Sequence, residues 1–154
     1  LMSSLRDKIK MSKEEMTSFL ESQTSLQIGT INKDGRPHLT TMWYFYTGEN
    51  FIFHTYTKSQ KIINLKRDPR ITVLTEAGNQ YSDLQGIIVY GNAEIINGKD
   101  NPEEVIKYMN IVGNEYIKGE DSTQYLEGMK LQAPKRSVVV VKPFKFISWD
   151  HTKV

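Results

Sequence analysis

The chain contains no cysteine, only five prolines and no long hydrophobic run. The absence of cysteine excludes disulfides, thiolate metal ligands and cysteine nucleophiles together. Residues 1–10 are rich in charge and lack an apolar stretch, which predicts neither a signal peptide nor a membrane span. We therefore expect a soluble, cytoplasmic protein that has no membrane partner.

An excess of charge of either sign is also absent. Twenty basic and 18 acidic residues leave a formal net charge of +2. Such a balance creates no general positive field, so nucleic acid is not an expected partner and any recognition of an anion must be local. The 154 residues, 38% of them hydrophobic, suffice for one core. We expect a single domain over residues 1–154, with residues 1–11 flexible.

Motifs for several reaction classes are missing as well. The sequence has no Gly-x-Ser-x-Gly nucleophile turn, no Gly-x-Gly-x-x-Gly dinucleotide loop and no Walker-type phosphate loop. The three histidines, His38, His54 and His151, show no paired spacing typical of metal ligands, so we expect no metal. If the protein is an enzyme, a bound cofactor must carry the chemistry, and the sequence indicates no dedicated catalytic acid or base.

Alternating apolar residues and turn signals predict a mainly β fold with flanking helices. Helices are expected over residues 13–21, after a capping box that begins at Ser12, and over residues 59–68, 102–117 and 123–131. Strands are expected over residues 26–31, 36–46, 51–56, 70–75 and 84–96, and two more over residues 137–141 and 144–149, joined at Lys142 and Pro143. Hairpin order interrupted by helices predicts a small closed antiparallel barrel, in which we expect six of these seven segments as strands.

Hydroxyl and basic side chains gather where the strand over residues 51–56 turns into a helix. Ser59 is a natural N-cap, so unpaired backbone amides and the positive end of the helix dipole are expected at Ser59, Gln60 and Lys61. The side chains of Thr55, Lys58 and Lys61 lie beside them in the sequence. This combination predicts a phosphate-binding cradle. The alternative is an ordinary solvated basic helix.

The order of these elements, together with four motifs, resembles the flavin-binding split-barrel family, which includes the pyridoxamine phosphate oxidase-like proteins and the oxidoreductases that use the deazaflavin coenzyme F420. The resemblance runs from about residue 12 to residue 149. Its motifs are IGTINKDGRPH at residues 28–38, MWY at 42–44, the basic segment 58–70 and VYGNAE at 89–94. It implies a six-stranded antiparallel Greek-key split β-barrel that forms a homodimer, with two flavin-type cofactors bound in grooves along the interface.

The resemblance also implies roles for individual residues. The cofactor phosphate would be held by Thr55, Lys58, Ser59, Gln60 and Lys61, and Lys61 stands where the family places a phosphate-binding lysine. Gln60 departs from the arginine that the family often has there. Met42, Trp43 and Tyr44 would contact the isoalloxazine-type ring, unless they are core or interface residues. His38 and Thr40, on the same face as Met42, are candidate substrate contacts.

Two cofactors fit this expectation. The basic residues Lys58, Lys66, Arg67 and Arg70 suit the acidic tail of coenzyme F420, whereas FMN needs only the cradle, and we favour F420. The implied activity is an oxidoreductase that transfers hydride or electrons between F420 or FMN and a small organic substrate. True pyridoxamine phosphate oxidase activity is not expected, because the chain lacks that enzyme's C-terminal Arg-x-His pattern.

Two alternatives belong to other classes of protein. The first is a non-enzymatic flavin or haem carrier, with His54 or His151 as the haem ligand. The second is a dimeric interaction module in which the aromatic run from Trp43 to Tyr46 only closes a subunit interface.

Overall fold

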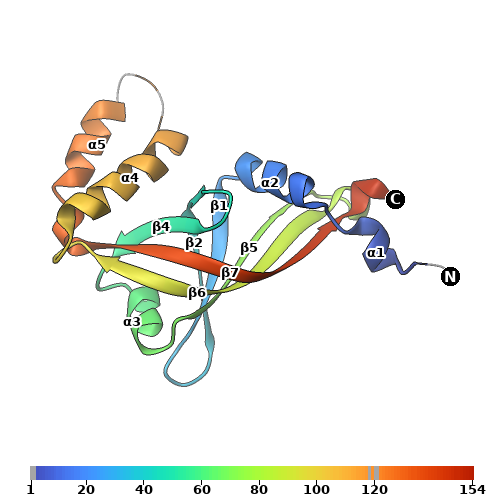
Figure 1. Cartoon of the computed structure of the whole chain (residues 1–154), viewed down its shortest axis with the longest axis horizontal. Helices are drawn as coiled ribbons and strands as arrows, with labels where there is room; N and C mark the ends of the chain where they lie inside the picture. The colour runs from blue at the N-terminus through green and yellow to red at the C-terminus, as the bar shows by residue number, and fades with distance from the viewer. Residues whose placement is uncertain (1–2, 118, 120–121) are drawn as a thin grey trace.

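The computed structural model describes residues 3–117, 119 and 122–154, and in this part of the chain seven strands form one antiparallel sheet that curls into a half-barrel (Figure 1). The strands are β1 (Ser25–Ile31), β2 (Pro37–Trp43), β3 (Phe45–Tyr46), β4 (Phe51–Tyr56), β5 (Arg70–Ala77), β6 (Gln85–Asn97) and β7 (Arg136–Asp150), in the spatial order β2-β1-β5-β6-β7-β4-β3. The helices are α1 (Leu5–Ile9), α2 (Lys13–Ser22), α3 (Gln60–Arg67), α4 (Pro102–Tyr116) and α5 (Ser122–Lys130).

The prediction of six strands in a closed barrel is wrong in two places. The expected strand over residues 36–46 is interrupted at Tyr44, whose side chain turns into the core and donates its hydroxyl to the carbonyl of Leu20. The chain therefore changes partner, so that β2 pairs with β1 and β3 pairs with β4. Among the described residues, β2 and β3 are the two edges of the sheet and no ladder joins them.

The second difference concerns Pro143, which was expected to separate two strands. Instead β7 runs through it, because the ladder with β6 shifts register there: Gly91 lies opposite Pro143 and Tyr90 opposite Lys145, leaving Phe144 as an extra residue. A bulge tolerates proline, which has no amide hydrogen to give to the ladder. Gly91 is required at this point, since a Cβ there would lie 2.6 Å from the carbonyl oxygen of Lys142.

The inner face of the half-barrel holds the main core. Alternate residues of five strands point inward, and α2 and α3 cover them with Leu20, Ile62 and Leu65. Burial of each such side chain contributes about 1.5–3 kcal/mol. The strand residues concerned are Leu26, Ile28, Phe51, Phe53, Ile71, Val73, Ile87, Val89, Val139 and Val141.

A second apolar cluster lies on the outer face of β4 and β7. There Ile52 and Val138 pack beneath α4, which contributes Val105, Met109 and Val112. In Figure 1, α4 and α5 stand together at one end of the sheet, and both chain termini lie at the other end. The helix α3 carries the chain from β4 across to β5, so the sheet is not a simple meander.

The N-terminal segment expected to be flexible contains α1. Ile9 and Met11 are buried, and the amide of Met11 donates to the Ser148 hydroxyl over 3.0 Å. The mobility of residues 1–11 stays a prediction. The capping box at Ser12 is confirmed, with hydrogen bonds of 3.0 and 3.1 Å to Glu15. No helix in the described ranges is long and apolar enough to cross a membrane.

Gly98 provides a test of how β6 and β7 are held together before α4. A Cβ at Gly98 would lie 1.8 Å from the carbonyl oxygen of Ala133 and 2.6 Å from that of Arg136. We expect Gly98→Ala to lower the free energy of unfolding by about 1–3 kcal/mol or more, the range for overpacking. Chemical denaturation measures this value.

Gly128→Ala is the matched control. A Cβ at this exposed position of α5 meets no atom within 4 Å. Because glycine disfavours a helix interior, this change should raise stability by about 0.5–1 kcal/mol. Equal effects of the two substitutions would contradict the packing described for Gly98.

Candidate functional site

Lys61 is a buried cation at the beginning of α3. Its side chain is only 7% exposed, and its ammonium donates to the Thr55 hydroxyl over 3.3 Å. Burial lowers the pKa of Lys61. No carboxylate of the described residues lies within ion-pair distance of it, although a buried charge normally needs a partner. The cradle predicted from sequence therefore holds a positive charge that lacks a counter-ion.

Ser59 adds an unused hydroxyl beside this charge. The residue caps α3 by its backbone position, but its side chain makes no capping hydrogen bond, and its Oγ atom is buried without a partner. The sequence predicted an unpaired backbone amide at Ser59. This prediction is wrong, because the amide donates to the carbonyl of Tyr56 over 3.0 Å. The first-turn amides left for an anion are those of Gln60, Lys61 and Ile62. Lysine, hydroxyl and amide donors thus meet at one helix end.

The other cradle residues take different positions. Lys58 and Gln60 are exposed, and the side-chain amide of Gln60 donates to the side-chain oxygen of Asn64 over 2.8 Å. Asn64 in turn donates to Thr30 and Asn32, which fixes α3 against the end of β1. The structure brings Lys61 and Thr55 into hydrogen-bond contact, places Ser59 at the N-terminus of the same helix and leaves Lys58 and Gln60 exposed.

The predicted ring-binding residues separate according to the face of β2. Met42 is half-buried against the core, whereas Trp43 is 47% exposed and stacks on Tyr116 with ring centroids 5.1 Å apart. Tyr44 is buried, which raises its pKa, and its carbonyl accepts from the Tyr116 hydroxyl over 2.7 Å. Its side chain belongs to the core, so a ring could meet only its backbone.

The two candidate substrate residues do not lie together. His38 lines a shallow depression of about 410 Å³ beside Gln60 and the turn between β1 and β2. Thr40 lines a groove on the outer face of the sheet. Neither lines the cleft that contains Met42 and Trp43.

That cleft, of about 480 Å³, lies between β2, β4 and the helices α4 and α5. It contains two residues that sequence reasoning did not bring together, His54 and Arg136. The Arg136 guanidinium donates to Nδ1 of His54 over 3.2 Å and lies 4.3 Å from the centroid of the Tyr56 ring. Burial and the Arg136 charge lower the pKa of His54 to about 4. His54 is therefore neutral at pH 7.

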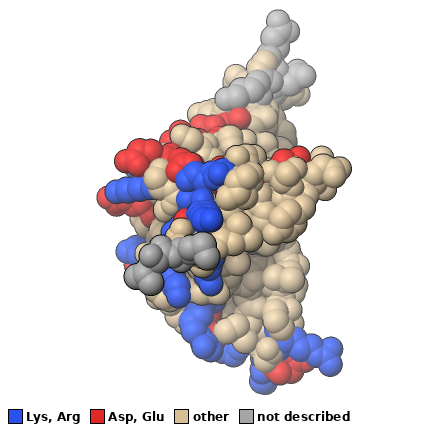
Figure 2. Space-filling model, turned by 90° about the vertical axis from the view of Figure 1, so that its right-hand side faces the viewer, with Lys and Arg blue, Asp and Glu red and all other residues tan. Residues whose placement is uncertain are grey.

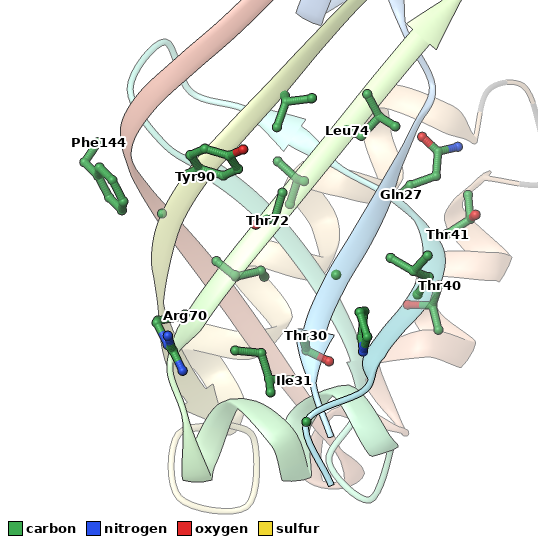
Figure 3. A pocket seen from close by; sticks show the side chains of 18 residues that line it. Gln27, Thr30, Ile31, Thr40, Thr41, Arg70, Thr72, Leu74, Tyr90 and Phe144 are labelled. Carbon is green, nitrogen blue, oxygen red and sulfur yellow. The ribbon is translucent and has the colours of Figure 1, made fainter. Parts of the chain in front are cut away.

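The groove on the outer face of the sheet is larger, about 740 Å³, and runs over β6, β5, β1 and β2 (Figure 3). Of the described residues that line it, only Arg70 is charged, and Asp68 pairs with it at 2.7 Å. Leu39 and Phe144 are each 71% exposed beside it. The Gln27 Oε1 atom, also in its lining, is buried without a hydrogen-bond partner. The Thr40 Oγ1 atom is likewise without a partner, but it lies on the inner face of β2, where Thr40 pairs with the core residue Ile28. In Figure 3, α3 lies at one end of this groove.

The charged residues are unevenly distributed over the surface. Figure 2 shows basic and acidic residues gathered along one flank and at the lower end of the side that it presents, while the other flank is largely uncharged. Within the described ranges, no group of three or more histidine, aspartate or glutamate residues is arranged to hold a metal ion.

An antiparallel half-barrel, with hydroxyl and lysine side chains at the turn after β4, defines a split-barrel protein of the flavin-binding class. The family model for pyridoxamine 5'-phosphate oxidase matches residues 12–150, and the chain belongs to this family. No curated protein sequence matches the chain.

Solved structures support this assignment. The conserved hypothetical protein Rv2991 from Mycobacterium tuberculosis is 35% identical, with a TM-score of 0.83 over 98% of this chain and 92% of that chain. An F420 reductase is 23% identical, with a TM-score of 0.65 over 84% and 93%. HutZ, a heme storage protein from Vibrio cholerae, is 13% identical, with a TM-score of 0.69 over 88% and 93%. The last two share the fold.

Lys61→Ala tests the cradle. We expect it to weaken FMN binding by about 1–3 kcal/mol, or roughly five- to hundredfold in Kd, because a charge-assisted hydrogen bond to phosphate is lost. Fluorescence titration of FMN measures the change. Lys66→Ala, an exposed lysine on the same helix, should leave FMN affinity unchanged. Equal affinities of Lys61→Ala and wild type would refute the cradle.

The lowered pKa of His54 predicts a pH dependence of stability. The unfolded chain binds a proton at His54 near its ordinary pKa of 6.5, whereas the folded protein resists protonation until about pH 4. The unfolded state therefore holds more protons in this window, and stability should fall as the pH drops from 6.5 to 4, on the order of 3 kcal/mol. Denaturation across this range measures the loss.

His54→Gln should remove most of that slope, because glutamine can accept from Arg136 without titrating. His38→Gln is the matched control and should retain it. Glu15 and Asp68, each with a pKa lowered to about 2 by hydrogen bonds and charge from Lys153 and Arg70 respectively, lose their contribution only at lower pH. A slope that survives His54→Gln would contradict the assignment.

Proposed function

We propose that this protein is a homodimeric oxidoreductase that binds a flavin-type cofactor, F420 in preference to FMN, and transfers hydride or electrons to or from a small organic substrate in the cytoplasm. The observation that carries the proposal is the buried Lys61 charge beside Thr55 and the unpartnered Ser59 hydroxyl. A cofactor phosphate supplies the missing negative charge and the missing hydrogen bond together.

The choice of F420 depends on the basic residues outside the cradle. Lys58 and Lys66 are exposed and have no ion pair among the described residues, so both can meet an acidic tail. Two other candidates are occupied, since Arg67 donates to the Ile31 carbonyl and to Asn64, and Arg70 pairs with Asp68. The tail would therefore run from Lys58, which precedes α3, toward Lys66 near the end of the helix.

The homodimer is proposed from the outer groove. A monomer would leave Leu39 and Phe144 in water and the Gln27 oxygen without a donor. A second copy packed on this face would bury the apolar side chains and bring a donor group to this oxygen. Because α3 lies at one end of the groove, such a partner would also form one side of the cofactor site (Figure 3).

The roles of this chain's residues follow from their positions. Thr55, Ser59 and Lys61 would bind the phosphate, and Trp43, held by its stacking on Tyr116, would orient the ring. When bound, the cofactor supplies the hydride or electron transfer. The subunit partner and the helices α4 and α5 would exclude water from the ring.

The test is a titration of the purified protein with F420 and with FMN under one buffer condition, followed by sizing and by a reduction assay. We expect a dimer, tighter binding of F420 than of FMN, and turnover of the bound cofactor with a small electron acceptor.

Three results would change the proposal. Preference for FMN would make the protein a flavin oxidoreductase. A bound flavin or haem without turnover would favour the carrier alternative. A monomer that binds neither cofactor would overturn the proposal.

A further inference from the structure

Arg136 is a cation whose partners are all neutral. It stacks on the Tyr56 ring, donates to Nδ1 of His54 over 3.2 Å, and lies 3.4 Å from the Gln132 amide oxygen. No carboxylate of the described residues forms an ion pair with it. These contacts hold the guanidinium in one orientation and leave its charge uncompensated.

His54 contributes a donor and no charge. Because its Nδ1 accepts from Arg136, the ring carries its proton on Nε2. The pKa of about 4, lowered by burial and by Arg136, keeps the imidazole neutral at pH 7. The cleft therefore contains one fixed positive charge and an uncharged hydrogen-bond donor.

The rest of the cleft combines apolar, aromatic and hydroxyl side chains. Trp43 of β2, Tyr125 and Met129 of α5 and Val112 of α4 give it apolar and aromatic surface, and Thr24, Ser25 and Thr41 add hydroxyl groups. No aspartate or glutamate lines it, and its volume of about 480 Å³ exceeds that of a bicyclic ring. Thioether and aromatic surfaces favour a flat, polarisable body.

The cleft adjoins the phosphate cradle across one strand. Thr55 of the cradle stands between His54 and Tyr56 of β4, and Tyr56 lies opposite Arg136 in the ladder with β7. Successive residues of a strand face opposite sides. A cofactor anchored at Thr55 and a ligand held at Arg136 would therefore bind on either side of β4, at the same end of the strand.

We propose that this cleft is a separate ligand site and that it takes an aromatic carboxylate, whose acid group pairs with Arg136 and whose ring lies between Tyr125, Met129 and Val112. The inference goes beyond the proposed function and does not depend on it, because the cradle and the cleft lie on opposite sides of β4. Arginine suits this role because its planar fork binds a carboxylate through two parallel hydrogen bonds.

The experiment compares 1-naphthoate with its uncharged analogue 1-naphthamide by isothermal titration calorimetry on the cofactor-free full chain. Wild type should bind the acid at least tenfold more tightly than the amide. Arg136→Met should lose this preference by weakening the acid alone, while Arg136→Lys, which keeps the charge without the fork, should retain part of it. Lys142→Met, at an exposed lysine paired with Glu94, should bind both probes as wild type does.

Equal affinity for acid and amide, no binding of the acid, or an acid affinity unchanged by Arg136→Met would each overturn the inference. If Arg136→Met fails to fold, the wild-type preference and the partial loss in Arg136→Lys still decide. FMN and F420 titrations are run on the same samples. Failure of both cofactors to bind, with the Arg136-dependent preference intact, would overturn the proposed function and leave the carboxylate site standing.

Discussion

The burial of the Lys61 charge without an acidic partner is the constraint on which this account of the protein depends. A cation removed from water costs several kcal/mol unless an opposite charge or hydrogen bonds compensate it. Here a single hydroxyl, that of Thr55, is its hydrogen-bond partner in the described part of the chain. The buried and unused Ser59 hydroxyl lies at the same helix end. Both shortages would end if one phosphate bound, which supports the proposal that the cradle is an anion site and not a solvated helix.

The fold positions this charge through β4. The strand is fully paired with β7, its inward residues anchor the main core, and its outward residues lie under α4 or line the cleft. Because Thr55 faces one side while His54 and Tyr56 face the other, a single strand presents a phosphate site and an arginine-lined cleft back to back. Arg136 and Lys61 are thus two uncompensated cations at one end of the sheet, each with surroundings of a different kind. The cradle is polar, whereas the cleft combines aromatic, apolar and hydroxyl side chains.

Much of the site could be predicted from sequence because its residues are close in the chain. Thr55, Ser59 and Lys61 fall within one strand-to-helix turn, and local capping rules bring them together. The pairing of His54 with Arg136 could not be predicted, because it depends on the register between β4 and β7, which are 82 residues apart at this point. An arginine at the start of the apolar run 137–141 was the available signal. The break at Tyr44 and the bulge at Pro143 were missed because tertiary packing, not local preference, decides them.

The most direct measurement of the central claim is the ³¹P NMR titration of FMN bound to wild type and to Lys61→Met. If Lys61 is the counter-ion of the phosphate, the bound phosphate should stay dianionic to a lower pH than in free FMN, because the neighbouring positive charge favours the doubly charged form. That downward shift of the phosphate pKa should be lost in Lys61→Met. A bound phosphate that titrates like free FMN, or one that titrates alike in both proteins, would contradict the account.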